Sequence, residues 1–217
     1  MAGDSGLVKD LRQKTGAGIM DCKQALVESD DDVDKAIDWL RQKGLASAGK
    51  KMGRATNEGV IASYIHAGSK VGVLVEVNCE TDFVARNDEF KALVKDILLQ
   101  IAANKETLYV RREDVPQAVV EKELQIYRGQ AKELGKPQTA WEKIAAGKLE
   151  KFYQDTCLVE QPFIKDPAQT VGELVTEKIA KTGEKVTIRR FARYKMGEGL
   201  SKREDDFGDE VAKLAGA

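Results

Sequence analysis

The chain has 217 residues, 42% of them hydrophobic and 33% charged, and its formal net charge of −1 excludes the overall basic field that drives non-specific nucleic-acid binding. Three cysteines, Cys22, Cys79 and Cys157, lie far apart and form neither a disulfide framework nor a metal-ligand spacing. No apolar run approaches the roughly 20 residues of a membrane helix, and the first residues lack a secretory signal, so we expect a protein of a reducing compartment.

Three short helical patterns occupy residues 1–44. Their apolar positions are Leu7, Val8 and Leu11, then Ile19, Met20, Ala25 and Leu26, and finally Val33, Ala36, Ile37 and Leu40. The glycines of TGAG at 15–18 separate the first two helices, and the acidic run at 30–32 provides a cap for the third. Gly44 is expected to end that third helix. The pattern predicts a three-helix bundle, a small binding module without a catalytic cluster.

A stretch rich in glycine, alanine and serine comes next. We expect residues 45–58 to form a flexible basic linker, with a helical turn in its first half. From Arg41 to Arg54 the sequence has basic residues and no acidic one. A solvated surface is the commoner meaning of such a charge run, and a site for phosphate or an acidic partner is the sharper alternative.

The apolar period changes to two from Val60 onward. This change predicts two strands joined by the AGSK turn at 67–70, the second of them dense in valine. Asn87 can cap a following helix, and two further helices are expected near 115–134 and 138–153.

The end of the body combines one helix with one strand. Thr170 and Glu173 match a capping box for a helix that runs to about Ala180. The segment after it alternates with period two, which predicts a last strand with one face formed by Val186, Ile188, Ala192 and Tyr194. We therefore predict an α+β body over residues 59–199 with a small antiparallel sheet of about three strands, and a charged tail over 200–217.

The sequence offers few groups for chemistry. His66 is the only histidine and has no partner at ligand spacing, which argues against a metal or catalytic-base role. The nearest phosphate-loop lookalike has Gln130 where the loop needs glycine, and Pro137 in place of serine or threonine. A site of paired carboxylates stays open, because acidic residues are spread along the chain. We expect no cofactor, no metal and no enzyme active site.

The segment ETDFV at 80–84 lies between the valine-rich strand and the helix that begins near Asn87. Asp82 and Phe83 are therefore expected side by side in a loop between two rigid elements. In one interpretation, Asp82 is a turn or cap residue and Phe83 plugs the core. In the other, the pair forms a projecting tip, with an aromatic wedge beside a negative charge, as is common at interfaces.

Two long segments resemble the signatures of the elongation factor Ts family. LRQKTGAGIMDCKQAL (11–26) is similar to the first signature, and EVNCETDFVARN (76–87) is similar to the second, in the family's order and spacing. The resemblance continues through LEKFYQDTCLVEQPFIKD (149–166) and the final strand. It covers essentially the whole chain and favours the projecting tip.

The resemblance implies a guanine-nucleotide exchange factor for elongation factor Tu, the GTPase that brings aminoacyl-tRNA to the ribosome. A three-helix UBA-like head would dock on the GTPase, and by position the docking residues would be Arg12, Ile19, Met20 and Lys23. A second element would enter between two helices of the GTPase near its magnesium site and loosen the nucleotide. By position, this exchange element would be Thr81, Asp82, Phe83 and Val84.

Longer family members carry a duplicated core and a further helical insertion, whereas this chain has one core unit that ends in the strand at 186–194. It resembles the short members, which are thought to pair two copies through that unit, so we expect a homodimer and a 2:2 complex. A last strand at a sheet edge suits self-association. Ala192 stands where some short members have a cysteine, which excludes a disulfide between copies at this position.

Three other functions remain as alternatives. The helical head alone would suit a ubiquitin-type or peptide-binding module with an unrelated body. Arg189, Arg190 and Arg193, together with the basic linker, would suit an RNA-binding protein, although the near-neutral charge argues against it. Cys22 or Cys79 would be the nucleophile of a cysteine enzyme, although apolar surroundings favour packing. We expect a location in the cytoplasm, or in the stroma of a plastid, with no membrane contact and no direct nucleic-acid binding.

Overall fold

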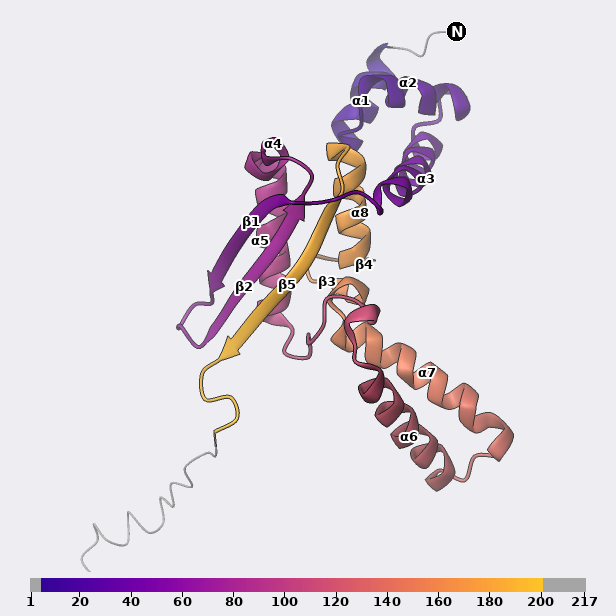
Figure 1. Cartoon of the computed structure of the whole chain (residues 1–217). Coiled ribbons are helices and arrows are strands. Elements are labelled where there is room, and N and C mark those ends of the chain that lie inside the picture. The colour runs from indigo at the N-terminus through magenta and orange to yellow at the C-terminus, as the bar shows by residue number, and fades with distance from the viewer. Residues whose placement is uncertain (1–4, 201–217) are drawn as a thin grey trace, which may run out of the picture.

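The computed structural model describes residues 5–200 and has three parts (Figure 1). A head of three helices leads into a body built on a three-stranded sheet, and a helical hairpin projects from the body away from the head. This arrangement confirms the α+β class predicted from the sequence. Of the charged tail predicted over 200–217, residues 201–217 lie outside the described part of the chain.

The head consists of α1 (Ser5–Thr15), α2 (Ile19–Glu28) and the first part of α3 (Val33–Lys51). Asp32 caps α3, because its carboxylate accepts two backbone N–H groups of the first turn at 3.1 Å each. The head has a small core of its own, formed by Val8, Leu11, Cys22, Ala25, Leu26 and Ala36. The predicted three-helix bundle is confirmed.

The third helix does not end at Gly44, as predicted, but continues to Lys51. Gly44 lies where α3 packs against α8 (Val171–Thr182), and a Cβ added there would lie only 3.0 Å from the Cβ of Ala180. The glycine therefore permits a close helix–helix contact and does not serve as a C-cap. As a result, the first half of the stretch predicted as a linker is helical.

The sheet of the body contains β1 (Glu58–Ile65), β2 (Val71–Cys79) and β5 (Val186–Lys195). The order is β1-β2-β5 with antiparallel pairing throughout, so the valine-rich β2 is central and β5 is an edge strand. α5 (Asp88–Ala103) and α8 pack on one face of this sheet, and Asn87 caps α5 as predicted. The core under the sheet includes Val73, Val75, Val77, Phe90, Ile97 and Val171.

A β-bulge in β5 changes which of its residues share a face. The register with β2 shifts between Glu76 and Val77, which leaves Arg189 as an extra residue. Ile188 before the bulge is buried, whereas Tyr194 beyond it is 73% exposed on the outer face. The prediction that one face holds Val186, Ile188, Ala192 and Tyr194 was therefore wrong, because one inserted residue reverses the alternation of the strand.

The hairpin consists of α6 (Gln117–Glu133) and α7 (Gln138–Thr156), close to the predicted ranges. Arg112 joins its base to the body, since the guanidinium donates to the carboxylate of Glu160 at 2.7 and 2.9 Å and to that of Glu150 at 3.0 Å. Two carboxylates that face one guanidinium give a charge-assisted network. The hairpin is thus fixed where it leaves the body.

The remaining elements were only partly predicted. Two short 3-10 helices and a small antiparallel pair of strands were not expected, and they are Arg112–Asp114, Leu158–Glu160, β3 (Pro162–Phe163) and β4 (Asp166–Thr170). The capping box of Thr170 and Glu173 at the start of α8 is confirmed. α8 ends at Gly183, whose φ of 74° is the left-handed conformation that glycine adopts without strain.

Candidate functional site

A one-turn helix, α4 (Asp82–Arg86), stands where the sequence predicted a loop. Thr81 begins it, because the hydroxyl accepts the N–H of Val84 at 3.5 Å and the carbonyl accepts the N–H of Ala85 at 3.2 Å. The expected loop conformation of the Asp-Phe pair was therefore wrong. The two residues open a capped helical turn between β2 and α5.

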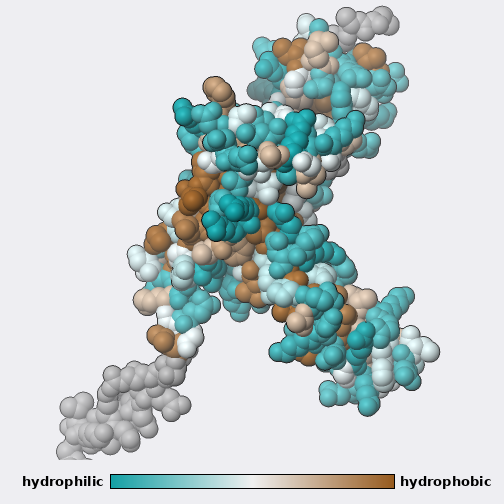
Figure 2. Space-filling model, in the orientation of Figure 1, coloured by the Kyte–Doolittle hydropathy of each residue, from teal (hydrophilic) through white to brown (hydrophobic). Residues whose placement is uncertain are grey.

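Phe83 is the second residue of this turn, and its side chain projects into solvent. Its exposed fraction is 83%, whereas Ala85 is buried and Val84 is partly buried against the core. The interpretation of Phe83 as a core plug was therefore wrong. The carboxylate of Asp82 lies 3.0 Å from the guanidinium of Arg86, one turn further on. Figure 2 shows a hydrophobic protrusion at this end of the body. The exposed aromatic ring of Phe83 is thus next in sequence to a charged pair.

The base of α4 is tied to the connection between α8 and β5. Glu80 accepts the backbone N–H of Lys185 at 2.6 Å, and its carboxylate lies 3.3 Å from the guanidinium of Arg54. The Lys185 N–H and, to a lesser degree, Arg54 hold the pKa of Glu80 below its usual range. The ammonium group of Lys185 donates to the carbonyls of Met52 and Arg54 at 2.5 and 2.9 Å. The chain leaving the head therefore meets the base of α4.

The exposed surface of the head carries the residues predicted to dock. Arg12 lies in the last turn of α1, and Ile19, Met20 and Lys23 lie on α2, all of them exposed. Ile19 and Met20, which the sequence placed on the inner apolar face, are 47% and 74% exposed. Val27 is 58% exposed and lies one turn beyond Lys23, so it extends this surface. Its apolar character at that spacing was the signal that sequence reasoning missed.

The predicted docking and exchange residues do not form one cluster. The first set lies on α1 and α2, and the second lies on α4 and the residue before it. Both α4 and the head lie toward the end of the molecule opposite the α6–α7 hairpin (Figure 1). The two sets of residues therefore form two separate surfaces.

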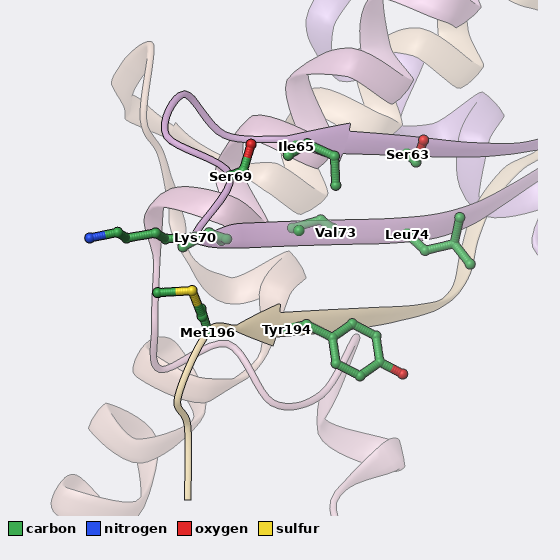
Figure 3. Close-up of a pocket in the computed structure, with 10 residues that line it drawn as sticks. Ser63, Ile65, Ser69, Lys70, Val73, Leu74, Tyr194 and Met196 are labelled. Carbon is green, nitrogen blue, oxygen red and sulfur yellow. The ribbon is translucent and has the colours of Figure 1, made fainter. Parts of the chain in front are cut away.

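The outer face of the sheet is a third apolar surface. A shallow depression of about 430 Å³ lies at its end, and Figure 3 shows the side chains around it. Exposed apolar residues on or beside this face are Ile61, Ile65, Leu74, Tyr194 and Met196, with exposed fractions between 48% and 73%. A contiguous apolar patch on a protein surface is typical of a region that another molecule covers.

The three cysteines are fully buried. Burial raises the pKa of the Cys22 and Cys157 thiols, and it raises that of Cys79 to about 11. Because the thiolate is the reactive form, these environments favour packing and argue against a cysteine nucleophile.

Residues 5–200 offer neither a metal-binding cluster nor a membrane-spanning helix. His66 has its Nδ1 atom 3.0 Å from the hydroxyl of Tyr64, and within that range no cluster of three or more His, Cys, Asp or Glu side chains is arranged to hold a metal ion. None of the helices between residues 5 and 200 is long and apolar enough to cross a membrane.

Known proteins similar to this chain point to one family. The family model described as Elongation factor TS matches residues 46–198, which include α4, the hairpin and the whole sheet. Elongation factor Ts of Carboxydothermus hydrogenoformans is 61% identical over 208 residues, which are 96% of this chain and 95% of the relative. The Elongation factor Ts proteins of Geobacter sulfurreducens and Desulforamulus reducens are 57% and 58% identical, over 96% of this chain and 96% and 95% of their own lengths.

Proposed function

This chain belongs to the elongation factor Ts family, and we propose that it is a guanine-nucleotide exchange factor for elongation factor Tu. It binds the GDP-loaded GTPase, disturbs the site that holds Mg²⁺ and the phosphates, and promotes GDP release so that GTP can rebind during translation elongation. The observation that carries this proposal is Phe83, which is 83% exposed beside Asp82 on a turn that is tied to the sheet.

In this proposal the head recognises the GTPase. The apolar side chains of Ile19 and Met20 form the centre of the docking surface, with Arg12 and Lys23 at its edge. Apolar groups surrounded by charged ones are the usual composition of a protein interface. Val27 adds apolar area to the same surface, as its exposed fraction of 58% allows.

The turn α4 performs the exchange. GDP is held in a GTPase by Mg²⁺ and by the backbone N–H groups of a phosphate loop. A phenyl ring inserted between helices near that site displaces packing that holds the metal's ligands in place. The carboxylate of Asp82 competes for donors or repels anionic groups nearby. Its present partner is the exposed guanidinium of Arg86, and an exposed ion pair of this kind costs little to exchange for another.

Exchange of this kind is a matter of linked binding equilibria. Nucleotide and factor must weaken each other's affinity for the GTPase by the same ratio. A hundredfold loss of GDP affinity corresponds to about 2.7 kcal/mol of coupling, which is within the reach of one inserted aromatic side chain. No covalent bond is made or broken, so the chain acts without an enzyme active site or a cofactor of its own.

We propose further that two copies pair through the outer face of the sheet, giving a 2:2 complex with the GTPase. Support comes from the exposed apolar residues on that face and from the edge position of β5. Because position 192 is alanine, pairing depends on packing alone. Sedimentation of the wild type should give a dimer mass at micromolar concentration, and Leu74→Asp should give a monomer. A wild-type mass of one chain over this range would contradict the pairing.

The partner is a protein and not a nucleic acid. Arg189 and Arg190, candidates for RNA contact, each donate to the carboxylate of Glu76 at 2.7 Å and hold its pKa below the usual range. One carboxylate thus balances half of their combined charge, and the formal net charge of the chain is −1. We place the protein in the cytoplasm, where the proposed partner works.

The test is GDP release from elongation factor Tu. The GTPase is loaded with a fluorescent GDP, mixed with excess unlabelled nucleotide in a stopped-flow instrument, and followed with and without this protein. Wild-type protein should accelerate release, and the double variant Asp82→Ala/Phe83→Ala should lose most of the acceleration while still binding the GTPase. If the wild type gives no acceleration with a competent GTPase, the proposed function is wrong.

A further inference from the structure

The residue before α4, Thr81, has every polar atom occupied. Its backbone N–H donates to Oε2 of Glu184 at 3.0 Å, and its hydroxyl donates to Oε1 of the same carboxylate at 2.7 Å. Its carbonyl accepts the thiol of Cys79 at 3.1 Å as well as the first backbone N–H bond of the turn. Glu184 therefore holds the N–H and hydroxyl of Thr81, and Cys79 holds its carbonyl, just before the turn begins.

The thiol of Cys79 is a suitable donor at physiological pH. Burial raises its pKa to about 11, and the nearby carboxylate of Glu184 acts in the same direction. The sulfur therefore keeps its proton and can donate it to the carbonyl of Thr81. The two groups that hold Thr81 thus belong to the central strand and to a connection far along the chain.

Glu184 is itself held in place. It follows Gly183, the left-handed residue that ends α8, and its own N–H lies 3.4 Å from the hydroxyl of Thr182. The next residue, Lys185, is bound through its N–H by Glu80 and through its ammonium group by the chain that leaves the head. The carboxylate that binds Thr81 therefore belongs to a connection that is held by hydrogen bonds at Glu184 itself and at the next residue, Lys185.

A helix as short as α4 needs such support. The five residues Asp82–Arg86 form a single turn, and nucleation makes an isolated turn of this size unstable in water. Phe83 makes little contact with the body, so its direction depends on the direction of the turn. The two hydrogen bonds from Thr81 to an ionised carboxylate are of the strong, charge-assisted kind.

We infer that Glu184 is a positioning residue for nucleotide exchange: it grips Thr81 through two hydrogen bonds and so fixes the direction in which Phe83 projects. The inference rests on the proposed exchange function. It gives Thr81 a different part from that of its neighbours, since it anchors the turn while Asp82 and Phe83 contact the GTPase. Without the grip, the turn must be ordered during insertion, which adds to the barrier for GDP release and leaves docking by the head unchanged.

The variants are Glu184→Ala, which removes both bonds, and Glu184→Gln, which keeps one acceptor oxygen. Glu177→Gln is the control, because Glu177 lies on α8 and its partner is the neighbouring Lys181 at 2.9 Å. The maximal rate of GDP release should fall about tenfold for Glu184→Ala and less for Glu184→Gln, an amount comparable to the ordering of one or two side chains. The concentration of factor at half-maximal rate should stay unchanged for all three.

Hydrogen exchange of the free protein provides a second measurement that needs no GTPase. The amides of Val84 and Ala85 should exchange faster in Glu184→Ala than in the wild type, and at the wild-type rate in Glu177→Gln. The wild-type protein is measured in the same GTPase assay. If it does not accelerate GDP release, the proposed function fails; if it does but Glu184→Ala is equally fast, only the positioning role of Glu184 fails. An unchanged maximal rate for Glu184→Ala, with or without faster amide exchange, would overturn the inference. So would a rate loss matched by an equal loss of binding.

Discussion

The head and the turn α4 both present exposed apolar side chains, but they are supported in opposite ways. The head's surface residues lie on α1 and α2, helices of 11 and 10 residues that pack over a core of their own. Phe83 sits on a single turn whose direction depends on groups from β2 and from the α8–β5 connection. A surface that recognises a partner can be spread over several side chains, whereas a group that must displace a partner's packing needs one rigid mount.

Energetics follow the same division. In an interface, binding energy is shared, and most single side chains contribute little when they are removed. A wedge has no such redundancy, because its effect disappears when the ring is lost or when the ring points elsewhere. The head should therefore control how much factor is needed, and the turn should control how fast GDP leaves.

The largest effect is expected from the loss of the Phe83 ring, the proposed wedge. Phe83→Ala should lower the maximal rate of GDP release about a hundredfold, since burial of a phenyl ring contributes roughly 2–3 kcal/mol. Phe83→Leu should lie between the alanine variant and the wild type. The melting temperature should not change for either, because the ring is 83% exposed in the free protein. Stopped-flow release and calorimetric binding measure the two quantities, and a loss confined to affinity would contradict the assignment.

A head variant should show the opposite signature. Met20→Ala should raise the factor concentration at half-maximal rate about tenfold and leave the maximal rate unchanged, because it removes apolar contact area from docking alone. Val27→Ala should act in the same direction with a smaller effect. Asp38→Ala, on an exposed site of α3 outside the predicted surface, is the matched control. A reduced maximal rate for Met20→Ala would contradict the claim that the head affects only the concentration of factor needed.

The seam between head and body should affect both quantities. Gly44→Val places atoms where a Cβ would already lie 3.0 Å from the Cβ of Ala180, so α3 must move on α8. Overpacking of this kind costs about 1–3 kcal/mol, and we expect roughly fivefold changes in both the maximal rate and the half-maximal concentration. The pair Gly44→Val/Ala180→Gly should recover part of the loss. Wild-type kinetics for Gly44→Val would mean that the seam does not orient the head.

The smallest effect concerns the thiol beneath the turn. The pKa of Cys79 in the folded chain is about 11 against an ordinary value of 9.0, so its stabilisation is complete below pH 9 and is lost as the pH rises through 11. Between pH 8 and pH 10, wild-type protein should lose roughly 1 kcal/mol more unfolding free energy than Cys79→Ser. Urea unfolding at the two pH values measures the difference. Parallel losses in wild type and Cys79→Ser would contradict the shifted pKa.

Most of the secondary structure was predictable because it depends on local patterns. Residues close together in sequence determine the valine-rich strand, the cap at Asn87 and the capping box at Thr170. The errors arose where tertiary contacts decide. The sequence pattern predicts a helix end at Gly44, because the contact between α3 and α8 cannot be seen in it. The bulge at Arg189 follows from the pairing of β5 with β2, which the sequence of β5 alone does not specify.

The candidate site was predictable in its residues but not in its construction. The exposed aromatic ring at position 83 was one of two interpretations of the local pattern; the family resemblance favoured it, and the exposed fraction of Phe83 confirms it. The helical conformation of the turn, and its dependence on Glu184, were not predictable. Glu184 is an ordinary acidic residue in a charged stretch, and nothing within its neighbourhood in sequence indicates that it bonds Thr81.

The bond between Thr81 and Glu184 also sets an order of events during the protein's own synthesis. The two residues are 103 positions apart, and β5, which completes the sheet, is the last element described. At about 5–20 residues per second, a ribosome needs on the order of 5–20 s to move from one residue to the other. The head can fold within that interval from its own residues, whereas the turn acquires its support only after Glu184 has been synthesised. A nascent chain can therefore form the docking surface of the head before the turn α4 is held in place.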